Sequence, residues 1–163
     1  MTRFLSRRAV LSGAAAFAAT GPALAAFDPI AIKNQLTRER VGGLATQFLG
    51  TKVGRGECTD FVEKVLNMLN CFHKGYVWGL PANGIQPGII IQFWDTKFTS
   101  PDGRSTWGTA PGGQHTAIVL AWSGSVAKLI HQNDGVRKVT VRDVNLGWKH
   151  TGRMEFFQPL SQT

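Results

Sequence analysis

The segment from Gly54 to Leu69 constrains the fold of this chain more than any other. A glycine-framed turn at 54–56 leads into a run in which apolar residues recur at intervals of three and four. These apolar residues are Phe61, Val62, Val65, Leu66 and Leu69. The spacing places them on one face of an amphipathic helix, and that face must pack against another element. The pattern therefore predicts a helix over residues 58–70 with one side in the core.

The second half of the chain consists of short apolar runs separated by turn sequences. Strands are predicted at 88–94, 114–122, 126–132, 136–142 and 152–157. Ser123-Gly124 is predicted to be the two-residue turn that joins the second and third of these strands into a hairpin. Residues 98–113 are polar and rich in glycine and proline, so we expect a long exposed loop with Trp107 at its surface.

The region before the amphipathic segment is also helical in pattern. Residues 27–50 predict one or two helices, which Gly42-Gly43 would divide. Helices followed by a meander of strands is the order typical of an α+β fold. We therefore expect N-terminal helices packed on an antiparallel β-sheet.

The first 25 residues have the features of an export signal. Three arginines precede a short, weakly apolar stretch at 13–19, and residues 23–25 form an A-x-A cleavage site. The motif at 6–11 resembles a twin-arginine motif. We expect residues 1–25 to be removed on export to the periplasm or beyond, leaving 26–163 as a single domain without stable membrane insertion.

The charge balance narrows the range of partners. The formal net charge is +8, and the signal holds only three of the 18 basic residues, so the exported chain stays basic. A basic surface favours polyanionic partners such as a bacterial envelope, although a generally solvated basic surface explains the charge equally well. No block of Lys and Arg interleaved with aromatic residues is present, so nucleic-acid binding is not predicted.

Two cysteines are present, Cys58 and Cys71. At opposite ends of one helix their α-carbons would lie roughly 20 Å apart at about 1.5 Å per residue. A disulfide needs α-carbons within about 7 Å, so no bridge is expected, and Cys71 is interpreted as a small buried residue. Cys58 lies at the helix N-terminus, where the helix dipole favours the thiolate, the reactive form.

His115 begins a predicted strand and is the candidate base for such a thiol. With the turn at Ser123-Gly124, position 132 falls opposite position 115. His131 and Asn133 share one face of their strand and Gln132 the other, so the register decides whether His131 or Asn133 orients His115. Backbone N–H groups at the helix start, including that of Cys58, are the expected oxyanion donors.

Three further residues are predicted to bind substrate. Gln114 directly precedes the candidate base, and Trp107 lies in the loop before it. Asp60 would either line the cleft or cap the helix start.

Four short motifs carry a family resemblance. The motifs are Gly56–Val62, Pro87–Phe93, Gln114–Val119 and His131–Asn133. In order and coarse spacing they resemble the CHAP family of cysteine- and histidine-dependent amidohydrolases and peptidases. Two residues depart from its pattern: Ile89 replaces the usual Asp, and His131 replaces the usual Glu. A histidine at the third position also occurs in the related NlpC-type hydrolases.

The resemblance implies a papain-like α+β fold and cleavage of amide bonds, commonly in peptidoglycan peptides. It implies a Cys58–His115–His131 site supported by Asn133, with no metal or cofactor. An inhibitor or immunity protein as a further partner stays open.

Three alternatives remain at this point. Cys58, His115 and His131 could instead bind zinc as a three-ligand site. The same fold could serve as an inactive envelope-binding module whose tryptophans stack on sugars or peptides. The same site could also transfer an acyl group rather than hydrolyse it.

Overall fold

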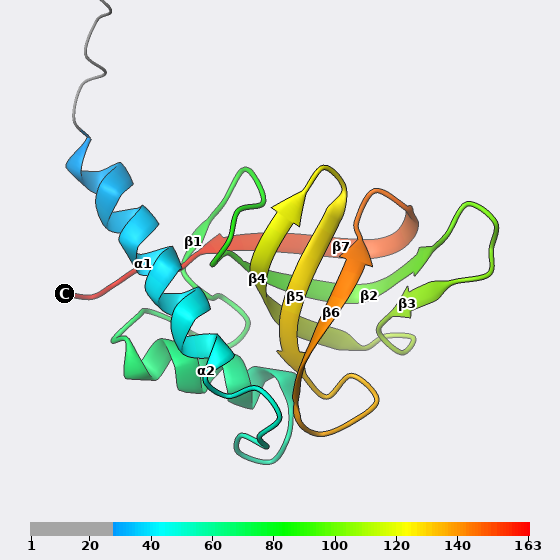
Figure 1. The fold of residues 1–163 in the computed structure, drawn as a ribbon, viewed down its shortest axis with the longest axis horizontal. Helices are drawn as coiled ribbons and strands as arrows, with labels where there is room; N and C mark the ends of the chain where they lie inside the picture. Colours follow the sequence, from blue (N-terminus) through cyan, green and yellow to red (C-terminus); the bar gives the residue numbers. More distant parts are fainter. Residues whose placement is uncertain (1–27) are drawn as a thin grey trace, which may run out of the picture.

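The computed structural model describes residues 28–163, so the predicted export signal at 1–25 lies outside the described residues. Two helices come first, α1 (Pro29–Thr46) and α2 (Cys58–Met68). The strands that follow are β1 (Leu80–Pro81), β2 (Ile90–Thr99), β3 (Thr106–Gly108), β4 (Gln114–Ser123), β5 (Val126–Gln132), β6 (Val139–Asn145) and β7 (Lys149–Gln158). Helices therefore precede strands (Figure 1), which confirms the α+β class.

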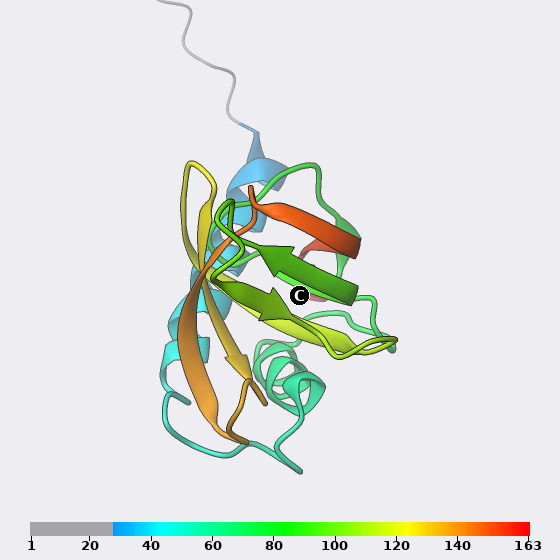
Figure 2. The same ribbon diagram turned by 90° about the vertical axis from the view of Figure 1, so that its right-hand side faces the viewer.

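The strands form one antiparallel sheet. Its order is β1-β7-β2-β4-β5-β6, and β3 pairs with β2 beside this path. Every pairing in it is antiparallel, as predicted. The sheet curves strongly, so that β5 and β6 run at a steep angle to β2 and β7 (Figure 2).

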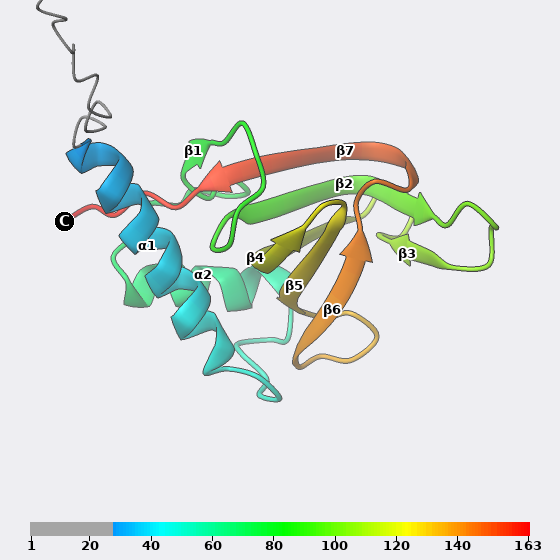
Figure 3. The ribbon, with the colours of Figure 1, turned by 45° about the horizontal axis from the view of Figure 1, so that its top comes forward.

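Both helices lie on the same side of the sheet, beside β4 (Figures 1 and 3). One core cluster joins them to the sheet. Its members include Val41 of α1, Val62 of α2, and Ile118 and Ile130 of the sheet, all of them fully buried. The opposite face of the sheet forms a second cluster that includes Phe93. Within residues 28–163 neither helix has the length and apolar character needed to cross a membrane.

The first helix differs from the expectation, because α1 runs without interruption through Gly42-Gly43. A mid-helix glycine costs only about 1 kcal/mol relative to alanine. Val41 and Ala45 on either side of the pair are fully buried, and their packing holds this turn in the helix. Of the one or two helices expected over this segment, the structure forms one, and the glycine pair does not divide it.

The predicted loop at 98–113 is the second difference. Strand β2 extends to Thr99, and β3 pairs with it, with Trp107 opposite Phe98. The Trp107 ring lies 5.1 Å from the Phe93 ring and 5.9 Å from the Phe98 ring, measured between centroids. Trp107 is therefore partly buried. The prediction that it stands exposed in a loop is wrong, because the aromatic side chains of β2 bind it.

The hairpin of β4 and β5 has a different register from the expected one. Ser123 pairs with Val126, which moves the turn by one residue, and the ladder shifts again between Val119 and Ala121. As a result His131 pairs with Ala117, and position 133 rather than 132 falls opposite position 115. This places His131 on the same sheet face as His115. Two later strands also begin at other residues than predicted, β6 at 139 and β7 at 149.

Candidate functional site

Cys58 is the first residue of α2, and a buried side chain fixes the loop before it. Gln132, at the end of β5, is fully buried. Its Oε1 accepts the backbone N–H of Val53 at 2.7 Å. Its Nε2 donates to the carbonyl oxygens of Val53 at 3.0 Å and of Glu57 at 2.7 Å. The residue that precedes the thiol is thus bound to the strand that carries His131.

Asp60 closes the first turn of α2 and contacts the loop. Its Oδ2 accepts the backbone N–H groups of Arg55 at 2.7 Å and of Glu57 at 3.3 Å. The Arg55 guanidinium also donates to Oδ1 at 2.9 Å, and this hydrogen bond lowers the pKa of the Asp60 carboxyl. Asp60 is not among the residues that line the cavity described below. Of the two roles left open, the structure supplies the cap.

His115 and His131 lie on adjacent strands and are bonded to each other. Nε2 of His115 is 2.7 Å from Nδ1 of His131, and the two rings meet edge to face. The second nitrogen of His131, Nε2, lies 3.5 Å from Oδ2 of Asp134. The same carboxylate oxygen forms an ion pair with Nε of Arg142 at 2.5 Å. The four side chains form a continuous series from the cavity to the solvent-exposed side of β6.

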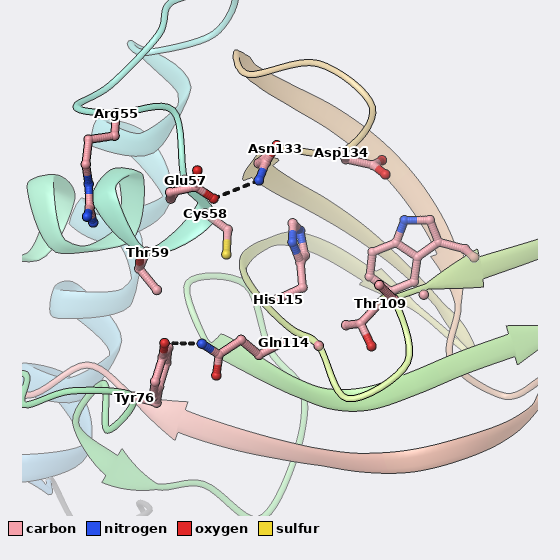
Figure 4. A pocket seen from close by; sticks show the side chains of 14 residues that line it. Arg55, Glu57, Cys58, Thr59, Tyr76, Thr109, Gln114, His115, Asn133 and Asp134 are labelled. Carbon is pink, nitrogen blue, oxygen red and sulfur yellow. Dashed lines mark hydrogen bonds between the residues drawn. The ribbon is translucent and has the colours of Figure 1, made fainter.

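A cavity of about 470 Å³ brings the candidate thiol and base together. Figure 4 shows the Cys58 sulfur and the His115 imidazole side by side at this cavity. No hydrogen bond joins these two side chains in the described structure. Because Nε2 of His115 is engaged by His131, Nδ1 is the nitrogen available to the thiol.

Burial sets the protonation of the site. It raises the pKa of the Cys58 thiol, although the backbone of Thr116 and Thr59 acts in the opposite direction. Burial, followed by the proximity of His131, lowers the pKa of His115 to about 3. Burial also lowers the pKa of His131 to about 4, with Asp134 raising it and Arg142 lowering it further. At neutral pH the site therefore holds a thiol and two neutral imidazoles. The backbone at the helix start lowers the pKa of Cys58, as predicted, but burial outweighs this effect and the net pKa is raised.

The other predicted residues occupy different walls of the cavity. Asn133 donates from Nδ2 to Oε2 of Glu57 at 2.8 Å, so it contacts the nucleophile loop, while His131 contacts His115. Gln114 donates to the hydroxyl of Tyr76 on the side away from Asn133 (Figure 4). Trp107 forms a third wall, with its ring centroid 5.9 Å from that of His115.

Sequence reasoning missed several residues that shape the site. Glu57, Tyr76, Thr109 and Asp134 line the cavity, and Gln132 anchors its loop. Asp134 has the clearest sequence signal, since it directly follows the predicted His131–Asn133 motif. In the sequence it begins an Asp-Gly pair typical of a tight turn, which conceals its position beside the histidine pair.

Both cysteines are free, and they lie at or just beyond opposite ends of α2. In residues 28–163 no group of three or more His, Cys, Asp or Glu side chains has an arrangement that could hold a metal ion. The zinc alternative therefore has no donor group in this part of the chain.

A comparison with solved structures found proteins of similar fold. The chain resembles the crystal structure of Ly7917 with a TM-score of 0.51 at 16% identity, over 76% of this chain and 62% of that one. A second Ly7917 structure, with the hydrolyzing product of MDP, gives 0.52 at 16% identity, over 76% and 63%. The chain thus spans less than two thirds of Ly7917, and at this identity the likeness shows the fold alone.

No functionally curated protein matches the sequence. The model of the AIM3/BBC1 cysteine proteinase-fold domain matches residues 33–163. This confirms the predicted cysteine proteinase type of fold, whereas the finer assignment to CHAP or NlpC stays a prediction. The chain belongs to the AIM3/BBC1 cysteine proteinase-fold domain family.

Proposed function

We propose that this protein is an exported thiol hydrolase that cleaves amide bonds, with Cys58 as nucleophile and His115 as base. One observation carries the proposal: the Cys58 sulfur and the His115 imidazole lie side by side at one cavity, while His131 binds the far nitrogen of His115 at 2.7 Å. A nucleophile, a base and a group that orients the base are the minimal set for such chemistry.

The reaction starts from the neutral pair. As the Cys58 sulfur attacks the substrate carbonyl carbon, Nδ1 of His115 takes the thiol proton. The backbone N–H of Cys58, at the start of α2, stabilises the negative charge that develops on the carbonyl oxygen. The His115 imidazolium then protonates the leaving amine, and a thioester remains. Water, deprotonated by His115, hydrolyses the thioester and restores the thiol.

Burial makes the proton transfer from Cys58 to His115 depend on a bound substrate. Both charged forms, the thiolate and the imidazolium, are disfavoured in the empty cavity. A bound amide places its carbonyl at the helix start, where the incipient charge is neutralised as it forms. The thiol and the imidazole therefore rest in their neutral forms, and the charged pair forms only as an electrophile is attacked.

Peptidoglycan peptides are the substrate class we propose. The predicted export signal, the basic net charge and the resemblance of the motifs support it. Ly7917, a protein with a similar fold, has been solved with the hydrolyzing product of MDP, which supports hydrolysis as the reaction class. The polar cavity lining, including Glu57, Thr59 and Gln114, suits an amide-rich substrate. Acyl transfer would use the same steps with an acceptor other than water.

The test uses the protein without residues 1–25 and soluble muropeptides from bacterial sacculi, with products identified by mass spectrometry. Cys58→Ala removes the nucleophile, and Cys71→Ala is the matched control, because Cys71 is buried at the other end of α2. We expect cleavage by the wild type and by Cys71→Ala, and none by Cys58→Ala. Cleavage by Cys58→Ala would overturn thiol catalysis. A wild type that binds sacculi without cleaving them would favour the binding module.

A further inference from the structure

We propose that Asp134 is a positioning residue that selects the tautomers of both histidines, so that His115 presents a bare Nδ1 to the Cys58 thiol. The proposal rests on the thiol-hydrolase function above and adds a residue that the family motifs do not include.

The argument begins with the proton between the two rings. A contact of 2.7 Å between Nε2 of His115 and Nδ1 of His131 requires one proton, and either ring can supply it. In the first arrangement His115 donates, so its Nδ1 is bare and can accept the thiol proton. In the second His131 donates, His115 then carries its own proton on Nδ1, and it cannot act as a base toward Cys58.

Asp134 distinguishes the two arrangements through the far nitrogen of His131. In the first arrangement that nitrogen, Nε2, carries a proton, and a carboxylate oxygen lies 3.5 Å away. In the second Nε2 is a bare acceptor facing a negatively charged acceptor, which is repulsive. Both imidazoles are neutral at pH 7, so these two arrangements are the relevant ones. The carboxylate therefore favours the arrangement in which His115 is a competent base.

Burial makes this preference strong. His131 is fully buried, and its Nε2 has no hydrogen-bond partner within residues 28–163; the Asp134 carboxylate is the charged group beside it. Interactions between charges and dipoles are weakly screened in such surroundings. At 3.5 Å the two atoms form no hydrogen bond, so the carboxylate acts on the buried ring through its negative charge.

Arg142, on β6, acts on both Asp134 and His131. Its Nε forms an ion pair with the same carboxylate oxygen at 2.5 Å, which holds that oxygen in place. Its positive charge also opposes protonation of His131. A protonated His131 would donate to His115 from Nδ1 and impose the wrong tautomer, so Arg142 protects the neutral pair. Asp134 and Arg142 also line a second cavity of about 560 Å³, from which solvent reaches them.

The test reads the tautomers directly by ¹⁵N NMR of the imidazoles at pH 7. Asp134→Ala removes the carboxylate. Asp134→Asn keeps an oxygen, which Arg142 orients toward His131. Asp143→Ala is the matched control, because Asp143 is an exposed carboxylate on β6 whose partner is Lys128, at 4.0 Å. We expect a bare Nδ1 on His115 in the wild type, in Asp134→Asn and in Asp143→Ala, and a loss of that signature in Asp134→Ala.

Iodoacetamide labelling of Cys58 at pH 7 gives the chemical consequence. We expect the rate to fall about tenfold or more in Asp134→Ala, the range typical of lost orienting partners, and to stay close to wild type in Asp143→Ala. A bare Nδ1 on His115 in Asp134→Ala, with an unchanged labelling rate, would overturn the inference. A wild-type Cys58 that iodoacetamide does not label would instead contradict the proposed function. The tautomer spectra need no reactive thiol and would still decide the role of Asp134.

Discussion

Gln132 donates a 2.7 Å hydrogen bond to the carbonyl oxygen of Glu57, the residue directly before the candidate nucleophile. The same amide group pairs with both backbone groups of Val53, so one buried side chain ties the loop of Cys58 to the strand of His131. The distance between thiol and base is thereby set by a strand rather than by a loop alone.

Replacing Gln132 by Leu is expected to destabilise the protein by about 2–4 kcal/mol, because three hydrogen bonds are lost and buried backbone groups stay unpaired. The midpoint of urea unfolding measures this loss. Gln35→Leu is the control, since Gln35 is exposed on α1 and bonds only to Glu39. Equal effects of the two substitutions would show that Gln132 does not hold the loop.

The histidine pair predicts how stability depends on pH. Folding lowers the pKa of His115 to about 3 and of His131 to about 4, below the value of about 6.5 for an unfolded chain. Between these limits the unfolded state binds more protons, so the contribution is fully present above pH 6.5. It is lost as the pH falls toward about 4 for His131 and about 3 for His115. Each histidine adds a slope of up to about 1.4 kcal/mol per pH unit.

Urea unfolding at pH 7, 6, 5 and 4 tests this dependence. In His131→Gln the slope should become shallower whatever the absolute stability, because one of the two buried histidines is removed. A wild-type stability that is flat from pH 7 to 4 would contradict neutral burial of the pair.

The residue pattern predicted the helix of Cys58, the antiparallel strands and the set of Cys58, His115 and His131, which the structure brings together. Periodicity and motif order were sufficient for this, because each depends on local spacing. The register of β4 and β5 could not be predicted in the same way. The ladder shift between Val119 and Ala121 leaves no mark in the apolar pattern of β4, yet it decides which face His131 occupies.

Properties that depend on the whole fold could not be predicted from the sequence. The helix N-terminus is a local effect on Cys58, whereas the burial that outweighs it comes from strands that lie some sixty residues away in the chain. Trp107 follows polar turn residues and so resembles a surface residue, but Phe93 and Phe98 bind its ring. The sequence around Asp134 is typical of a turn, but in the fold its carboxylate lies 3.5 Å from Nε2 of His131.

Two tryptophans allow a prediction about buried polar groups. Nε1 of Trp78 donates to Oε1 of Gln92 at 3.0 Å in the core. Nε1 of Trp107 is buried without a hydrogen-bond partner among the described residues. Trp78→Phe should therefore destabilise the protein by about 1–3 kcal/mol, while Trp107→Phe should cost less or stabilise it, because an unsatisfied donor is removed. Thermal unfolding of both variants gives the comparison. A larger loss for Trp107→Phe would mean that its N–H has a partner in solution, such as ordered water.

The reactivity of Cys58 should reveal base assistance rather than a preformed thiolate. Burial raises the pKa of the thiol, so an unassisted thiol would lose about tenfold in alkylation rate per pH unit below the ordinary value of about 8.5. Neutral His115 can accept the proton during alkylation at any pH above about 3, where its own pKa lies.

In a Cys71→Ala background, iodoacetamide labelling of Cys58 should therefore level off between pH 7 and 5. The same measurement in Cys71→Ala/His115→Ala should show a rate that keeps falling across this range. Parallel, steadily falling profiles in both proteins would mean that His115 does not act on Cys58, and the hydrolase proposal would then lose its base.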